Sequence, residues 1–283
     1  MKTQRWKRCA ASLFLAAVCL VLAAPDQGDA VLVDNNSAVP FADGFGISGW
    51  YVDGIAHLYQ QWCWYRVGPT GPEAPLADGG DLTLTYVYGT SNFLDLVYTE
   101  NSNAFEIEIT FLLAGGLPGS GSSDISETVT INNLTLEPLD MHFFQYSDFD
   151  LGGSVEDSSA EIDDPGDLRH AFQLGECVEL EALVIAESTV DPSADYAEVA
   201  YFSTTLDKLN DGDADDLSND LEPIGPGDLT WAFQWDVVIP AGGTWGFSAE
   251  KQIRVPEPAT LALLGLGLGV LGMSRRRARQ AAG

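Results

Sequence analysis

The feature that most constrains the fold of this chain is an alternation of apolar and polar residues with a period of two. In residues 105–111 the sequence FEIEITF places four apolar side chains on one side and three polar side chains on the other. Because successive side chains of a β-strand point to opposite faces, this pattern predicts a half-buried strand. Between the two ends of the chain, no ten-residue window has a convincing helical period.

Similar segments recur along the chain, rich in Val, Ile, Thr and aromatic residues and bounded by Gly, Pro, Asn or Asp. They predict further strands at 56–67, 81–88, 93–99, 125–136, 139–149, 177–187, 196–203, 228–239 and 243–255. The glycine- and serine-rich stretch 114–123 predicts a connection, and 240–243 (PAGG) predicts a hairpin. Many strands at short spacing indicate an all-β fold, an antiparallel, jelly-roll-like β-sandwich.

Residues 1–30 have the pattern of a secretory signal peptide. Four basic residues precede the apolar run 10–24, and small residues at 28 and 30 fit cleavage after Ala30. The apolar run is shorter than the ~20 residues that a membrane span needs. We therefore expect signal peptidase to remove this segment, leaving 31–254 as one exported domain or two small ones.

The C-terminal region, 255–283, has three parts in a fixed order. Pro256, Glu257 and Pro258 form a stiff tripeptide, an uncharged apolar segment follows at 259–274, and basic residues come next, at Arg275, Arg276, Arg277 and Arg279. Four glycines in the apolar segment are poor choices for a soluble helix but ordinary in a membrane helix. The segment predicts a short transmembrane helix whose arginines stay cytoplasmic, with the domain outside.

This three-part tail resembles the PEP-CTERM sorting signal of Gram-negative bacteria. The resemblance implies that an exosortase-type membrane protease recognises the tail and cleaves near the tripeptide. It also implies export by cells that make exopolysaccharide and form biofilms or flocs. The stretches 49–68, 144–157 and 227–243 resemble the exported parts of other PEP-CTERM proteins, a likeness that implies no activity.

The charge of the exported domain is strongly acidic. Of 13 Lys and Arg only five lie in residues 31–255, against 39 of 42 Asp and Glu, so the net formal charge there is −34. A domain without a basic surface cannot neutralise phosphates, which excludes nucleic acid as a partner. Acidity of this kind suits solubility, divalent cations or a polymer matrix.

Two cysteines remain after signal removal, Cys63 and Cys177. In an oxidising compartment they could form a disulfide, and two free buried thiols are the alternative.

The strongest candidate for a metal site is the acidic stretch 210–222 (NDGDADDLSNDLE). Asp211, Asp213 and Asp215 alternate as hard oxygen ligands, and Glu222 stands where the twelfth position of a calcium loop would. Asp216, however, occupies the place of the glycine that an EF-hand needs. The pattern therefore predicts a non-helical calcium loop or a solvated acidic loop, and no other cofactor.

Aromatic residues cluster on two expected strands, Trp62 with Trp64 and Trp231 with Trp235. Exposed rings of this kind stack on sugars, whereas buried rings form the core of a sandwich, and we favour the core. Three less periodic aromatics are better candidates for sugar contact, namely Trp50, Tyr51 and Tyr59.

The sequence favours a non-enzymatic cell-surface or matrix protein associated with exopolysaccharide, held for a time in the membrane before processing. A carbohydrate-binding module is the alternative. A glycoside hydrolase would need a carboxylate pair such as Asp148 and Asp150, which chance easily supplies in so acidic a chain.

Overall fold

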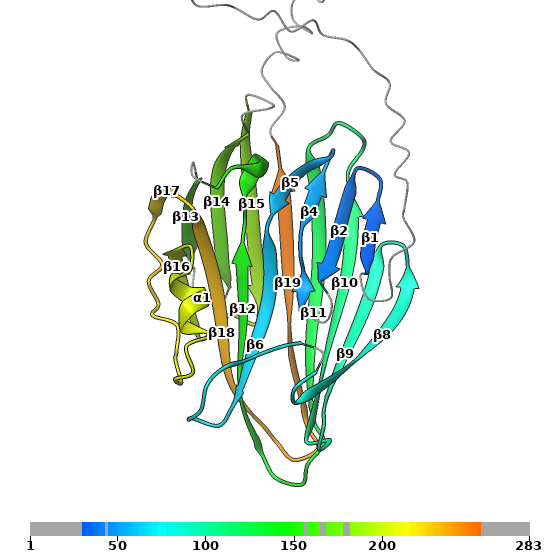
Figure 1. Ribbon diagram of the computed structural model, residues 1–283, viewed down its shortest axis with the longest axis vertical. Coiled ribbons are helices and arrows are strands. Elements are labelled where there is room, and N and C mark those ends of the chain that lie inside the picture. The colour runs from blue at the N-terminus through cyan, green and yellow to red at the C-terminus, as the bar shows by residue number, and fades with distance from the viewer. Residues whose placement is uncertain are drawn as a thin grey trace, which may run out of the picture.

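A computed structural model describes residues 30–42, 45–77, 79–155, 158–164, 168–177 and 182–255. Within these residues every strand pairing is antiparallel, and the strands form two stacked sheets (Figure 1). The predicted antiparallel β-sandwich is confirmed. The signal peptide and the transmembrane segment at 259–274 lie outside the described residues. Among those described, no helix has the length and apolar character to cross a membrane.

The first sheet has ten of the described strands, and eight of them form a continuous path. In spatial order these are β16 (Tyr196–Tyr201), β18 (Leu229–Ile239), β12 (Leu139–Asp148), β6 (Gln60–Val67), β3 (Gly46–Ile47), β2 (Ser37–Ala42), β4 (Trp50–Val52) and β5 (Ile55–Leu58). Off this path, β1 (Val31–Asp34) pairs with β2 and β7 (Ala74–Pro75) pairs with β6.

The second sheet has nine of the described strands. In spatial order they are β17 (Ile224–Gly227), β13 (Ser158–Asp163), β14 (Arg169–Cys177), β15 (Ala182–Asp191), β19 (Thr244–Arg254), β11 (Ser122–Asn133), β10 (Phe105–Gly115), β9 (Phe93–Glu100) and β8 (Leu82–Thr90). Two short helices complete the described elements, η1 (Leu151–Gly153) after β12 and α1 (Thr204–Lys208) after β16.

The core lies between the two sheets and follows the alternation of the sequence. On β10, Phe105, Ile107, Ile109 and Phe111 are all buried, as the period of two predicts. Aromatic rings meet across the sandwich: Trp235 of β18 stacks on Phe247 of β19 with ring centroids 3.8 Å apart. Burying large rings removes much apolar surface from water, so these contacts are a main source of stability.

The predicted hairpin at 240–243 is wrong, because this segment carries the chain from one sheet to the other. β18 belongs to the ten-stranded sheet and β19 to the nine-stranded sheet, and residues 134–138 make a similar crossing between β11 and β12. Buried Asn133 ties the two crossings together, since its Nδ2 donates to the carbonyl oxygens of Glu137, Ile239 and Pro240 at 2.8–3.0 Å. The predicted connection at 114–123 is confirmed for residues 116–121, which join β10 to β11, whereas the residues on either side of it belong to these two strands.

Candidate functional site

Most candidate functional side chains lie on the face of the ten-stranded sheet that points away from the nine-stranded sheet. We call it the outer face. The register of β6, β12 and β18 arranges this face in four rows. From one end to the other, the rows are Gln60–Asp148–Thr230, Trp62–Tyr146–Ala232, Trp64–Phe144–Gln234 and Arg66–His142–Asp236. The face therefore has an aromatic middle between two polar ends.

Residues 209–222, which we call the strap, cover part of the outer face. Leu209 and Leu217 are buried in a small apolar cluster with the aromatic middle rows. The strap is also held by hydrogen bonds: the backbone N of Leu217 donates to Gln234 Oε1 at 2.8 Å, and that of Ser218 to Glu198 Oε2 at 2.7 Å. The acidic stretch of the sequence is thus attached to the sheet at several points.

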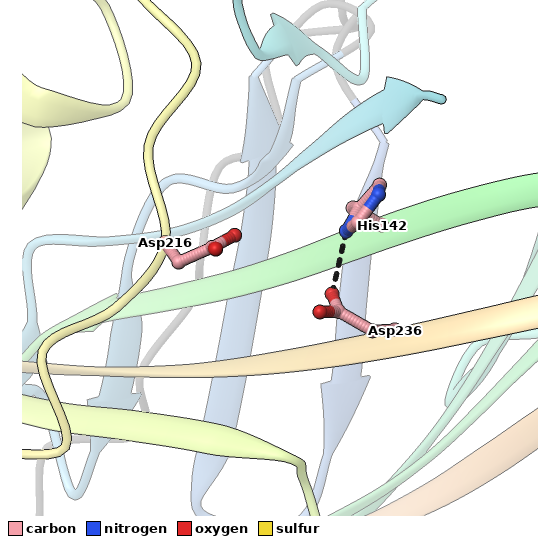
Figure 2. A group of neighbouring side chains, drawn as sticks. All are labelled: His142, Asp216 and Asp236. Carbon is pink, nitrogen blue, oxygen red and sulfur yellow. Dashed lines mark hydrogen bonds and ion pairs between the residues drawn. The ribbon is translucent and has the colours of Figure 1, made fainter. Parts of the chain in front are cut away.

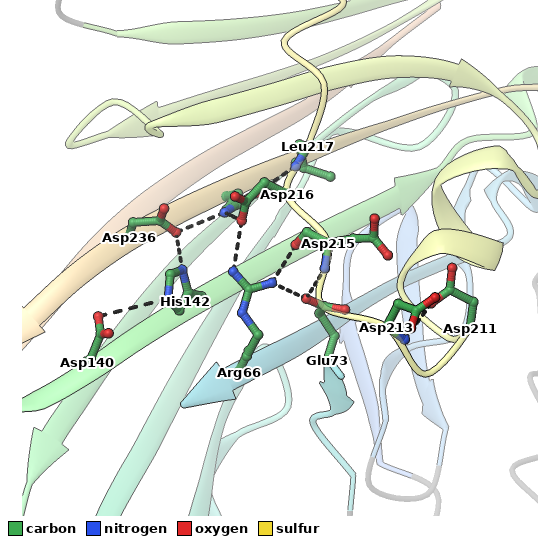
Figure 3. A network of polar contacts seen from close by, with 11 residues as sticks. Arg66, Glu73, Asp140, His142, Asp211, Asp213, Asp215, Asp216, Leu217 and Asp236 are labelled. Atoms are coloured by element: carbon green, nitrogen blue, oxygen red, sulfur yellow. Dashed lines mark hydrogen bonds and ion pairs between the residues drawn. The ribbon is translucent and has the colours of Figure 1, made fainter. Parts of the chain in front are cut away.

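Arg66 joins the strap to the sheet at the second polar end (Figure 3). Its Nη1 donates to the carboxylate of Glu73 and to the carbonyl oxygen of Asp215, and its Nη2 donates to Asp216 Oδ1 at 2.8 Å. The side chains of Arg66 and Glu73 are both buried. Although burial opposes it, hydrogen bonding to Asp216 and Glu73 raises the pKa of Arg66, so the guanidinium stays charged.

His142, Asp216 and Asp236 converge on one another (Figure 2) and lie beside Arg66 (Figure 3). His142 Nδ1 lies 2.7 Å from Asp236 Oδ1, and one ligand atom from each of the three residues lies within 4.8 Å of the others. Gln234 Nε2 donates to both carboxylates, at 2.8 and 2.9 Å. Burial opposes ionisation of Asp216, but the hydrogen bonds from Arg66 and Gln234 lower its pKa.

One imidazole and two carboxylates are a ligand set that zinc or manganese accepts. Here, however, Asp216 Oδ1 already accepts hydrogen bonds from Arg66 and Gln234, and Asp236 Oδ1 from Gln234 and His142. The arrangement suits a hydrogen-bonded clamp that fixes the strap to β12 and β18.

A second group of acidic side chains occupies the opposite polar end of the outer face. Asp148 ends β12, Asp150 precedes η1, and Asp228 comes immediately before β18. One carboxylate oxygen from each lies within 4.8 Å of the other two. Asp148 is 2% exposed, and its Oδ1 meets no hydrogen-bond partner among the described residues.

Burial and like charges change the ionisation of this group. Desolvation, followed by the charges of Asp150 and Asp228, raises the pKa of Asp148 to about 8. Desolvation and the charge of Asp228 raise the pKa of Asp150 to about 6. Carboxylates at such distances repel one another, which favours protonation of the group or a bound cation.

Exposed aromatic side chains flank this acidic end. The backbone N of Tyr59 donates to the carbonyl oxygen of Asp148, and that of Phe202 to the carbonyl oxygen of Asp228, each at 2.9 Å. Both side chains are exposed, Tyr59 at 60% and Phe202 at 43%. The two exposed rings therefore belong to residues whose backbones adjoin the acidic end.

The residues of the predicted calcium loop do not converge on one point. No three of Asp211, Asp213, Asp215 and Glu222 bring ligand atoms within 4.8 Å of one another in the described chain. Instead Asp211 Oδ1 accepts from the backbone N of Asp213, and the backbone N of Asp215 donates to Glu73. Asp216, the residue that breaks the EF-hand pattern, is the one that meets His142.

The structure agrees with some of the predictions for the aromatic residues and contradicts one of them. Trp231 and Trp235 are core residues, as favoured, and Trp64 is buried beneath the strap, whereas Trp62 on the outer face is half-buried. Trp50 as a surface contact is wrong: it is fully buried, with Nε1 donating to Ser123 Oγ at 3.0 Å. Tyr51 and Tyr59 are exposed, as a sugar contact requires, at 41% and 60%.

The cysteines and the sorting residues are described only in part. Cys63 is buried, it has no disulfide partner among the described residues, and burial raises the pKa of its thiol. The side chain of Cys177 lies outside the described residues, so the pairing of the two cysteines stays a prediction. Pro256, Glu257, Pro258, Arg275, Arg276 and Arg277 also lie outside the described residues. The last described residue is Val255, whose backbone N donates to the carbonyl oxygen of Gly121 at 2.8 Å.

Sequence reasoning missed His142, Asp216, Asp236 and Asp228 as site residues. The first three come from separate segments and meet only through the pairing of β12 with β18 and the position of the strap. Asp228 had a weak signal, because 227–230 repeats the sequence GDLT of 80–83, and both copies open a strand.

The PEP-CTERM protein-sorting motif matches residues 254–278 of the chain. The match contains the tripeptide and the three predicted sorting arginines. It begins at the last residue of β19, so it adjoins the sandwich directly. No curated protein matches the sequence as a whole.

Among solved structures, a bacterial glucoamylase complexed with acarbose is similar to this chain. The TM-score is 0.57 with 12% sequence identity, covering 86% of this chain and 34% of the glucoamylase, so the chain spans about a third of that protein's length. A putative aldose 1-epimerase from Escherichia coli K12 is more distant, at a TM-score of 0.49 and 12% identity over 80% of this chain and 98% of that one. At such identities the likeness to the glucoamylase shows a shared sandwich fold alone.

Proposed function

Because the chain carries the PEP-CTERM sorting motif and is therefore an exported protein processed by an exosortase, we propose that its acidic β-sandwich is a non-enzymatic component of the cell surface or extracellular matrix, associated with exopolysaccharide. The motif is the observation that carries this proposal. Export with a membrane-anchored sorting signal places the tail in the membrane until the protease acts. The sandwich is then released to the surface or the medium.

The chemistry of the outer face supports a role without catalysis. A glycoside hydrolase sets the pKa values of its two carboxyl groups apart, one raised and one kept low. In the Asp148 group the pKa values of Asp148 and Asp150 are both raised. At the other end, Asp216 and Asp236 are already engaged by Arg66, Gln234 and His142.

A carbohydrate-binding module is the second candidate, and the exposed aromatics favour it. Tyr59 and Phe202 flank the acidic end of the outer face, and half-buried Trp62 lies against Phe45 with ring centroids 5.2 Å apart. Aromatic rings in such positions stack on sugar rings. The fold is also shared with a glucoamylase that was solved with the carbohydrate acarbose, although that likeness concerns the fold only.

The sorting proposal is tested in the producing cell with and without its exosortase-type protease. Wild-type protein should appear at the surface or in the medium with an intact mass that lacks both ends. Replacing Pro256, Glu257 and Pro258 by alanine, or deleting the protease, should leave the tail attached and the protein in the membrane fraction. Glu222→Ala, an exposed change in the strap, is the matched control. Normal tail removal in the variant whose Pro256, Glu257 and Pro258 are replaced by alanine would refute the proposal.

The matrix association is tested separately with exopolysaccharide from the same cells. Exported wild-type protein should sediment with the polymer. A Tyr59→Ala, Phe202→Ala variant distinguishes the two candidates, because a module that stacks on sugars loses at least about tenfold in affinity for defined oligosaccharides without these rings. A surface protein held by its general acidity keeps its association. Absence of any association in both proteins would contradict the matrix role.

A further inference from the structure

The three carboxylates at the end of β12 form a site that the sorting route does not explain. Asp148, Asp150 and Asp228 come from a strand end, a turn and a strand start, and the fold brings their oxygen atoms within 4.8 Å of one another. In so acidic a protein many carboxylates lie near each other in solvent. This group differs because one of its side chains, that of Asp148, is buried.

Asp148 supplies the second observation. Its side chain is buried between Gln60 of β6 and Thr230 of β18, its register partners on the outer face. Asp148 Oδ1 has no hydrogen-bond donor among the described residues, and one of the two carboxylate oxygens of Asp148 belongs to the cluster of ligand atoms. A buried carboxylate oxygen without a donor costs free energy unless a proton or a metal ion satisfies it.

The charges around the Asp148 carboxylate do not neutralise its negative charge. Those that act on Asp148 come from Asp150 and Asp228, and both are negative. By contrast, the other buried acids of the outer face have cationic partners: Glu73 pairs with Arg66, and Glu198 with Lys208 at 2.8 Å. The fold therefore provides a cation for each of these two buried carboxylates, whereas the charges that act on Asp148 add to its own.

We propose that Asp148, Asp150 and Asp228 bind a calcium ion. The donor set consists of oxygen atoms only, which favours a hard cation over zinc or copper. Calcium takes six to eight oxygen ligands in flexible geometry, and Asp150 and Asp228 are half-buried, so water can complete the coordination on the solvent side. Magnesium demands a near-ideal octahedron and binds less readily to such a mixed set.

This site is distinct from the calcium loop that the sequence predicts. It uses none of the residues 211–222 and lies at the other end of the outer face from His142. A bound ion would fasten together the end of β12, the turn before η1 and the start of β18. The inference does not depend on the role of the exported domain, and its test needs no polysaccharide.

The test uses protein purified from the producing cell, treated with a chelator and titrated with calcium chloride. Calorimetry should show one saturable site, and calcium at about 100 times Kd should raise Tm by about 5 °C or more. Asp148→Asn and Asp150→Asn should each weaken calcium binding at least about tenfold. Both variants should fold without calcium, because each removes a like charge from the group.

The double variant Asp211→Asn, Asp213→Asn is the matched control and should bind calcium as the wild type does. Absence of saturable heat and of a Tm shift in the wild type would overturn the proposal, as would an equal response in wild type and Asp148→Asn. If only the Asp211→Asn, Asp213→Asn variant lost calcium binding, the calcium site would lie in the strap, and the proposal would also be overturned. Magnesium binding of equal affinity would refute the assignment to calcium. If Asp148→Asn does not fold, Asp150→Asn decides alone.

Discussion

Lys251 and Glu127 form an ion pair inside the sandwich, with Nζ 2.5 Å from Oε2 and both side chains wholly inaccessible to solvent. They face each other from β19 and β11 in the nine-stranded sheet. Two amides of the ten-stranded sheet complete the contacts of the carboxylate, since Gln61 Nε2 donates to Glu127 Oε2 at 2.8 Å and Gln145 Nε2 to Oε1 at 3.0 Å. These four polar side chains therefore link the two sheets through the apolar core.

Breaking this pair should strongly destabilise the protein. Glu127→Gln leaves a buried ammonium without its counter-charge, and we expect the free energy of unfolding to fall by about 3–5 kcal/mol. Lys251→Met should also destabilise, but less, because the two glutamine amides still donate to the carboxylate. The measurement is urea denaturation at pH 7.

The same two strands provide the control. Asp124 and Arg254 form an exposed pair 3.5 Å apart, three residues along β11 and β19 from the buried one. Asp124→Asn should change the free energy of unfolding by less than about 1 kcal/mol, since exposed pairs contribute little. If Asp124→Asn and Glu127→Gln lowered the free energy of unfolding equally, the prediction that the buried pair contributes more than the exposed pair would be wrong.

A second prediction concerns Arg66 and the strap. Arg66→Met removes the hydrogen bonds to Asp215 and Asp216 and leaves buried Glu73 without its cation. We expect faster hydrogen exchange of the backbone amides in residues 209–222 and a loss of about 3 kcal/mol or more in stability. Asp213→Asn, an exposed change in the same segment, should leave exchange unchanged. Unaltered exchange in Arg66→Met would show that the buried leucines and the hydrogen bonds to Gln234 and Glu198 hold the strap without Arg66.

Strands with a clear alternation of apolar and polar residues could be predicted from the sequence, whereas several others could not. Residues 105–111 alternate cleanly and form part of β10, because one face of that strand is buried and the other is not. The hairpin of β4 and β5 was missed although Asp53-Gly54 is a strong turn signal; both residues have positive φ, which an Asp-Gly pair accepts. Also missed were β1, β2, β3, β7, β13, β14 and β17, and the predicted strand 177–187 covers only the last residue of β14 and the first part of β15.

The prediction at 240–243 failed for a different reason. Its Pro-Ala-Gly-Gly sequence makes a tight turn, and the backbone N of Gly243 does donate to the carbonyl oxygen of Pro240 at 2.8 Å. Local residues determine such a turn, but not whether the next strand joins the same sheet. That choice depends on distant contacts such as those of Asn133.

The candidate site was least accessible to sequence reasoning because it depends on register. Arg66, His142 and Asp236 lie far apart in the chain and become neighbours only through the pairing of β6, β12 and β18. The regular spacing of acids at 211, 213 and 215 does not bring three of their ligand atoms together in the described residues, and calcium binding by this stretch stays a prediction. The sorting tail could be identified because its recognition depends on the order of residues and not on a fold.

The last prediction concerns His57, which is wholly buried on β5. Its Nδ1 accepts a hydrogen bond from the backbone N of Gly152 at 3.1 Å, so the neutral ring carries its proton on Nε2. Burial lowers the pKa of His57 from 6.5 to about 4, although the charge of Asp53 opposes the shift. The folded protein therefore resists protonation of this ring more than the unfolded chain does.

Because the folded pKa lies below the unfolded value, the stability that His57 contributes is present above about pH 6.5 and is lost as the pH falls toward 4. Between pH 7 and pH 4 the loss attributable to His57 is about 3 kcal/mol. His57→Gln retains a hydrogen-bond acceptor for Gly152 but cannot titrate. Urea denaturation of both proteins at pH 7, 5.5 and 4 should show the stability difference between wild type and variant shrinking or reversing by that amount. Parallel curves of stability against pH for wild type and His57→Gln would contradict the prediction.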